Sequence, residues 1–186
     1  SFLNIIYDES NRIQVLVNDL LELSKIERHG FTLDVTPTKL QDILVRVVDL
    51  TSSQLESKDM QFDVKIEQDA VILGDVNRLM QIFTNLINNA IAYSKEETTV
   101  TLCISANEQY GIFEVKDEGI GIEKAEISRI FERFYRVDRA RSRNSGGTGL
   151  GLSIVKHLIE AHHGKIQVAS EVGKGTSIKV FLPLQR

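Results

Sequence analysis

The order of strand-like and helix-like segments after residue 30 constrains the fold of this 186-residue sequence more than any other feature. Residues 98–105 and 112–116 both read as strands, and only a short turn separates them. Residues 165–170 and 177–182 repeat this arrangement around a glycine turn. Strands that follow one another so closely pair as antiparallel hairpins, because parallel strands need a long crossover. The sequence therefore predicts a largely antiparallel sheet.

Three segments of this region have the apolar spacing of amphipathic helices. They cover residues 40–55, 76–93 and 150–162, and residues 61–66 read as a further strand. Helices do not separate every strand pair, so we expect them on one face of the sheet rather than on both. The predicted fold class is α/β (α+β). We expect a two-layer sandwich with a mixed, largely antiparallel sheet and helices on one face.

A long amphipathic helix is predicted at the N-terminus, up to about residue 28. It contains no proline or glycine, and Gly30 stands where a helix stop is expected. The alternation over residues 31–35 then predicts a short strand closed by Pro37. We therefore expect two units, residues 1–29 and residues 30–186.

The composition limits the partners of the chain. Lys and Arg number 22 against 26 Asp and Glu, a net charge of -4, so nucleic acid is not an expected partner and any phosphate binding must be local. A single cysteine, Cys103, excludes an internal disulfide. No apolar run is long enough to cross a bilayer, so a soluble molecule is expected.

The first candidate site lies on the predicted helix 76–93. Asn85 and Asn89 are four residues apart on one stripe, which Tyr93 extends. A single asparagine on a helix usually belongs to a solvated face. Two amides in register favour a ligand stripe, because amide oxygens suit Mg²⁺ whose coordination is completed by phosphates and water.

The second candidate is Asp117-Glu-Gly119-Ile-Gly121, directly after a predicted strand. The aspartate can accept a hydrogen bond from a ligand amine, and the two glycines permit a tight turn with close backbone approach. Asp and Gly are also common in turns, so on its own the motif fits an ordinary acidic turn better.

The third candidate is the glycine-rich run from Gly146 to Gly151, which precedes a helix. Such a run presents backbone N–H groups and the helix dipole to an anion. It is neither a P-loop nor a dinucleotide fingerprint, because it lacks the closing Gly-Lys-Ser/Thr and the leading strand. Five arginines between Arg133 and Arg143 favour phosphate contacts. Residues 136–149 fit no regular element and are expected to form a mobile loop.

Taken in order, these motifs resemble the N, G1, F, G2 and G3 boxes of bacterial sensor histidine kinases. The matching segments are Asn85-Leu-Ile-Asn-Asn89-Ala, Asp117-Glu-Gly-Ile-Gly121, Phe131-Glu-Arg-Phe134-Tyr-Arg136, Gly147-Thr-Gly-Leu-Gly151 and Gly173-Lys-Gly-Thr176. Residues 131–152 most resemble the PhoR and WalK branch. The N-terminal helix resembles the second helix of the dimerisation and phosphoacceptor hairpin.

The resemblance implies the GHKL, or Bergerat, ATP-binding fold, with ATP and Mg²⁺ as cofactors. It implies that Asn89 ligates Mg²⁺ and that Asn85 supports the ion or the phosphates. Asp117 would accept the adenine amine, and Tyr93 would pack near the base. The remaining implied residues shape the adenine pocket (Gly119, Gly121, Thr176) or form the ATP lid (Phe131, Phe134, Arg136, Gly147, Thr148, Gly149, Leu150, Gly151).

The sequence departs from the family pattern at two points. Ala92 stands where many relatives have a basic residue that can reach a phosphate. The phosphoacceptor motif is also absent, since none of the four histidines has the required neighbours. We therefore expect the acceptor histidine outside this chain, and no complete autophosphorylation by it.

The function implied is that of a protein-histidine kinase, which transfers the γ-phosphoryl group of Mg·ATP for relay to a response-regulator aspartate. The implied partners are the acceptor helix of the same or a partner subunit, a receiver domain and a second copy of the parent protein. The resemblance implies a cytoplasmic domain of an integral membrane protein. A gyrase-type or Hsp90-type ATPase is disfavoured, because Asn85 replaces the glutamate base of those relatives. A noncatalytic binding module remains a further alternative.

Overall fold

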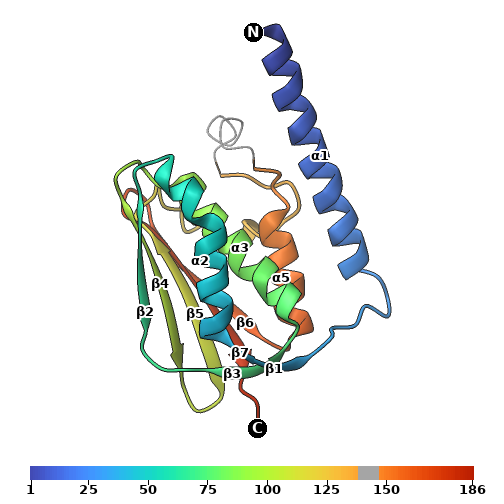
Figure 1. Ribbon diagram of the computed structural model, residues 1–186, viewed down its shortest axis with the longest axis vertical. Helices are drawn as coiled ribbons and strands as arrows, with labels where there is room; N and C mark the ends of the chain where they lie inside the picture. Colours follow the sequence, from blue (N-terminus) through green and yellow to red (C-terminus); the bar gives the residue numbers. More distant parts are fainter. Residues whose placement is uncertain (138–146) are drawn as a thin grey trace.

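A five-stranded sheet forms one layer of the molecule (Figure 1). Three pairs are antiparallel, whereas β2 pairs with β4 in parallel. The prediction of a mixed, largely antiparallel sheet is therefore confirmed. In spatial order the strands are β2 (Gln61–Ile66), β4 (Thr99–Ala106), β5 (Tyr110–Asp117), β7 (Gly175–Pro183) and β6 (Lys165–Glu171).

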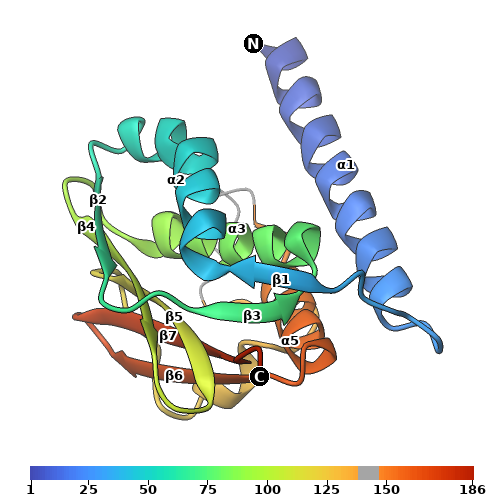
Figure 2. The same ribbon diagram turned by 60° about the horizontal axis from the view of Figure 1, so that its bottom comes forward.

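Three helices, α2 (Leu40–Glu56), α3 (Val76–Tyr93) and α5 (Gly151–Ala161), cover one face of this sheet (Figures 1 and 2). The core lies between the two layers, where alternate residues of the central strands meet the apolar faces of the helices. Phe83 of α3 stacks on Phe113 of β5 with ring centroids 3.8 Å apart. The predicted two-layer sandwich is thus confirmed, and its packing fixes α3 against the sheet.

Helix α1 (Phe2–Ile26) precedes the sandwich as predicted. Its last turns pack beside α5, where Leu23 and Ile26 are buried. Its N-terminal half projects away from the rest of the molecule (Figures 1 and 2). Many large apolar side chains of this half are exposed. Among the described residues, no helix is long and apolar enough to cross a membrane.

The strand predicted over residues 31–35 is wrong, because this segment has no partner strand and is irregular. Phe31 instead packs under the guanidinium of Arg78, 5.3 Å from its ring centroid. The strand forms just after it, as β1 (Thr36–Lys39), which pairs antiparallel with β3 (Val71–Gly74). Pro37 is tolerated there because a two-stranded ribbon leaves one edge of β1 without a strand partner.

The computed structural model describes residues 1–137 and 147–186. The mobile loop expected over residues 136–149 falls largely outside these ranges, as do Arg139, Arg141 and Arg143. A short 3₁₀ helix, η1 (Ile127–Arg129), follows the acidic turn and was not predicted.

Candidate functional site

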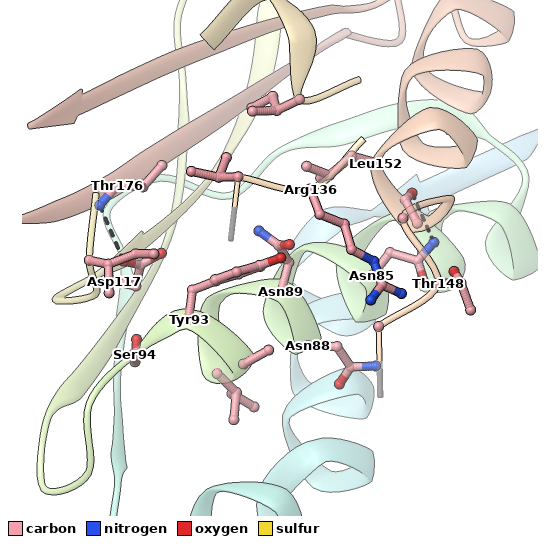
Figure 3. Close-up of a pocket in the computed structure, with 18 of the residues that line it drawn as sticks. Asn85, Asn88, Asn89, Tyr93, Ser94, Asp117, Arg136, Thr148, Leu152 and Thr176 are labelled. Atoms are coloured by element: carbon pink, nitrogen blue, oxygen red, sulfur yellow. Dashed lines mark hydrogen bonds between the residues drawn. The ribbon is translucent and has the colours of Figure 1, made fainter. Parts of the chain in front are cut away.

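A cavity of about 1220 Å³ lies beside the C-terminal half of α3 (Figure 3). Residues from several parts of the chain line it: α1, the end of α2, α3 with the residues after it, the end of β5 with the turn that follows, Ile130, the segments 135–137 and 147–152, and the start of β7. The predicted site residues in this lining are Asn85, Asn89, Tyr93, Asp117, Gly121, Arg136, Gly147, Thr148, Gly149, Gly151 and Thr176.

Helix α3 turns its amide stripe to the cavity and its apolar face to the core. Leu86 and Ala90 are buried, whereas Asn85 and Asn89 line the cavity, as the amphipathic spacing requires. The Asn85 side-chain nitrogen donates to the Gly151 carbonyl over 3.3 Å, which leaves its oxygen for other contacts. Asn88 has a buried side-chain oxygen without a hydrogen-bond partner among the described residues.

Asp117 closes one end of the cavity and is only 7% exposed. Its Oδ1 accepts hydrogen bonds from the backbone N–H groups of Gly119 (2.9 Å) and Thr176 (3.2 Å). Burial raises the pKa of the Asp117 carboxyl, and these two N–H donors oppose that shift. Within the described part of the chain, Oδ2 has no hydrogen bond. The site therefore offers a ligand a poorly hydrated carboxylate oxygen, which a donor group can stabilise.

The turn after Asp117 needs its glycines. A Cβ on Gly119 would overlap the Tyr93 carbonyl oxygen, and Gly121 combines a φ of +72° with close contact to the Glu171 carbonyl. The Ile120 N–H also donates to the Tyr93 carbonyl over 3.3 Å. The turn is thereby wedged between the end of α3 and β6, which holds Asp117 against the cavity.

The opposite end of the cavity is formed by residues 147–151 and Arg136. Figure 3 shows the Arg136 guanidinium reaching towards Asn85 and Thr148, far from Asp117 and Thr176. The Thr148 hydroxyl donates to Asp19 of α1 over 2.7 Å and accepts from the Leu150 N–H over 3.2 Å. Backbone N–H groups and the Arg136 guanidinium therefore gather where an anion can bind.

Four predicted residues lie outside the cavity lining: Gly119, Phe131, Phe134 and Leu150. The two phenylalanines contact the glycine segment and α5 through their backbones. The Phe134 N–H donates to the Gly149 carbonyl over 2.9 Å, and the Phe131 carbonyl accepts from the Ser153 hydroxyl over 2.8 Å. Sequence analysis missed Asp19 and Lys58, because no motif near either residue shows that it reaches the cavity.

The donor set fits Mg²⁺ only together with phosphate and water. No cluster of three or more His, Cys, Asp or Glu side chains that could hold a metal exists among the described residues. The amide oxygens on α3 are hard, neutral ligands, and Mg²⁺ is commonly completed by water and substrate phosphates.

Comparison with known proteins defines the class of this domain. Residues 74–186 match the family described as histidine kinase-, DNA gyrase B- and HSP90-like ATPases. This range includes α3, the turn after Asp117 and the glycine segment. The chain therefore belongs to this ATPase family, and the ATP-binding fold expected from its motifs is confirmed.

Within this class, the chain is similar to sensor kinases named WalK. It is 38% identical over 188 residues to the sensor protein kinase WalK of Staphylococcus epidermidis RP62A, covering 100% of this chain and 30% of the relative. It is also 38% identical to the sensor histidine kinase WalK of Bacillus subtilis 168, with coverages of 98% and 30%. The chain thus spans about 30% of the length of these curated relatives. The predicted resemblance to the WalK branch is confirmed.

The similarity to solved structures extends over nearly the whole chain and therefore includes α1. Full-length ShkA in complex with AMPPNP has a TM-score of 0.84 and 28% identity, covering 100% of this chain and 39% of ShkA. The histidine kinase AdeS of Acinetobacter baumannii has a TM-score of 0.80 over 99% of this chain and 84% of its own. AdeS is 22% identical, so it supports the fold alone.

Proposed function

We propose that this chain binds Mg·ATP and transfers the γ-phosphoryl group to a histidine on a helix outside the chain, for relay to a response-regulator aspartate. One observation carries the proposal: Asp117 and the glycine segment lie at opposite ends of one cavity, with the amides of α3 between them (Figure 3). An adenine nucleotide has its groups in a matching order, with the amine of the base at one end and the phosphates at the other.

At the base end, the free oxygen of Asp117 accepts the adenine amine, and Tyr93 packs near the base. Gly119 and Gly121 allow the turn to approach the base closely, and Thr176 lines the pocket beside Asp117. At the phosphate end, Arg136 and the N–H groups of the segment from Gly147 to Gly151 bind phosphate oxygens. This arrangement orients ATP, and orientation supplies most of the catalysis in phosphoryl transfer.

Asn89 and Asn85 are proposed to bind the Mg²⁺ ion that accompanies the ATP phosphates. Bound Mg²⁺ supplies neutralisation of the charge that develops on the transferred group. Asn89 serves as its protein ligand, while Asn85 is oriented by its bond to Gly151 and supports the ion or the phosphates. Arg136 takes over the phosphate contact that a basic residue at the position of Ala92 makes in many relatives.

The acceptor is proposed to be external because no histidine of the chain lines the cavity. His162 is buried and uses both ring nitrogens in hydrogen bonds, to Asp75 and Leu158. His157 lies 3.1 Å from a carboxylate oxygen of Glu27. An imidazole must reach the γ-phosphorus in line to react, and these rings are held elsewhere.

We further propose that the parent protein is a homodimeric membrane sensor with this domain in the cytoplasm. In this proposal residues 1–29 form the second helix of the dimerisation hairpin, and residues 30–186 form the catalytic domain. The exposed apolar side chains of α1 support the proposed dimerisation through this helix. The other partner is the receiver domain of a response regulator.

Labelling with γ-labelled ATP tests the assignment. This chain alone is expected to remain unlabelled, whereas a longer chain with the preceding helix becomes labelled with an acid-labile phosphohistidine. Asn89→Ala in the longer chain abolishes the label. An acid-stable label on serine or threonine would contradict the histidine-kinase assignment, as would steady ATP hydrolysis without any phosphoenzyme.

A further inference from the structure

Lys58 lies in the turn between α2 and β2, and its side chain reaches the C-terminal end of α3. The ammonium group donates to the Ile91 carbonyl over 2.7 Å and to the Ser94 carbonyl over 2.8 Å. Ile91 and Ser94 are both buried, and Lys58 lines the cavity beside them. One side chain from another element thus pairs two main-chain acceptors at the end of the helix that holds the amide stripe.

This contact adds to the hydrogen bonding at the end of α3. A helix leaves its last four carbonyl groups without intrahelical partners. Here the Ala90 carbonyl accepts from the Ser94 hydroxyl over 2.7 Å, and the Tyr93 carbonyl accepts from the Ile120 N–H over 3.3 Å. Lys58 supplies the donor for Ile91, and its positive charge suits the negative end of the helix dipole.

The end of α3 is connected directly to the base end of the cavity. Ser94 pairs with Gly119 in an isolated β-bridge, and the Gly119 N–H donates to Asp117 Oδ1 over 2.9 Å. Movement of Ser94 therefore moves Gly119, which helps to orient the Asp117 carboxylate. Among the described residues, Lys58 has no hydrogen bond to the Asp117 carboxylate or to Gly119, so its link to the base end runs through the end of α3.

The backbone around Lys58 is also held by tertiary contacts. Its carbonyl accepts from the Glu97 N–H over 3.2 Å. Asp59, the next residue, has a φ of 51°, and Glu97 has a φ of 61°. Non-glycine residues rarely adopt this left-handed conformation unless the surrounding structure enforces it. Both the main chain and the side chain of Lys58 thus fasten the α2–β2 turn to the residues that follow α3.

We propose that Lys58 is a positioning residue that fixes the end of α3 and thereby sets Asp117 for recognition of the adenine base. The inference rests on the proposed function, because it needs adenine to bind at Asp117. Its effect is expected at the base end, since Lys58 is hydrogen-bonded to the end of α3 and to the segment that follows it.

The test compares Lys58→Met with the unchanged chain, using Mg·ATP, adenosine and Mg·tripolyphosphate as separate ligands. Methionine has a similar length but no donor, so two buried carbonyls lose their partner. We expect affinity for ATP and adenosine to fall about tenfold while affinity for tripolyphosphate is unchanged. Lys58→Arg, which keeps the charge and the donors, should restore ATP affinity. Lys65→Met is the matched control, because Lys65 is an exposed lysine of β2 that pairs with Asp63.

Equal weakening of ATP and tripolyphosphate would overturn the inference, since it would indicate general loosening of the domain. Unchanged ATP affinity in Lys58→Met would overturn it as well. Where Lys58→Met does not fold, Lys58→Leu, which also lacks a donor, carries the same comparison. Failure of the proposed function itself looks different: the unchanged chain would then bind GTP as well as ATP.

Discussion

At Asp117, the free energy of folding and the free energy of binding oppose each other. Burial raises the pKa of this carboxyl above its ordinary value, so the folded chain holds the proton more tightly than the unfolded chain does. The stabilisation is present below the unfolded pKa and is lost as pH rises through the folded pKa. When this carboxyl is ionised in the folded domain, its burial carries a cost, which the amine of a bound base offsets.

Asp117→Asn is expected to lower ATP affinity about 10- to 100-fold without lowering the thermal midpoint at pH 7. The amide oxygen can keep the bonds from Gly119 and Thr176, but its NH₂ group then meets the adenine amine donor to donor. The same NH₂ can face the carbonyl of guanine, so the preference for ATP over GTP should shrink. Calorimetric titration with both nucleotides measures this, and an unchanged ratio would remove Asp117 from the base site.

Asn89→Ala is expected to reduce Mg²⁺-dependent ATP affinity at least about tenfold while the domain stays folded, because the side chain lies on the ligand stripe rather than the apolar face. Titration at fixed ATP with and without Mg²⁺ separates the metal contribution. Asn77→Ala, an exposed asparagine of the same helix, is the control. Equal metal dependence in the two variants would contradict the ligand role.

At the scale of elements, the start of α3 depends on the end of α5. The Asp75 side chain caps α3 by accepting from the Arg78 N–H over 3.2 Å. The Asp75 N–H donates to His162 Nε2 over 3.1 Å, and Nδ1 of the same ring lies 2.7 Å from the Leu158 carbonyl. A carbonyl only accepts, so Nδ1 carries the proton and the ring is neutral. Protonation of Nε2 would remove the acceptor for Asp75.

Stability should therefore fall in mild acid. Burial lowers the pKa of His162 below its ordinary value of 6.5. The stabilisation is present above 6.5 and is lost as pH falls through the folded pKa, with a slope of up to about 1.4 kcal/mol per pH unit. His162→Gln keeps an acceptor and does not titrate, so its urea-unfolding free energy should depend less on pH between about 6.5 and 5. Parallel pH profiles for both proteins would contradict this role of His162.

At the scale of the whole molecule, α1 contacts the rest of the molecule through charged side chains near its C-terminal end. Glu22 pairs with Arg78 at 2.6 Å, and Asp19 accepts from Thr148. Glu27 contacts both Arg133 and His157. In the N-terminal half of the helix, by contrast, large apolar side chains are exposed. Ile13, for example, is 61% exposed.

Self-association through the N-terminal half of α1 is the expected result. Burying each exposed leucine or isoleucine contributes roughly 1.5–3 kcal/mol, enough to favour pairing at high concentration. Ile6→Asp with Ile13→Asp should shift the chain towards monomer in sedimentation velocity. The control is Leu50→Asp, a 64% exposed leucine of α2, which should leave the mass unchanged. Equal loss of self-association in both variants would place the interface elsewhere.

The sequence determined the helices, the hairpins and the order of the nucleotide motifs, because each follows from residues close together in the chain. The stripe of Asn85 and Asn89 follows from helical periodicity, and the turn at Gly119 and Gly121 follows from residue type. The strand predicted over residues 31–35 does not form. Their alternation matches a strand, but a strand also needs a partner. The available partner, β3, lies far along the chain and pairs with residues 36–39 instead.

Only the tertiary structure decided which distant residues meet. At the cavity Asp19 reaches Thr148 and Lys58 reaches the end of α3, and outside it His162 reaches Asp75. None of these pairs is close in sequence, so no local spacing encodes them. Periodicity fixes which face of an element is apolar, whereas the packing of α1, α2 and α5 around α3 fixes which polar groups lie within hydrogen-bonding distance.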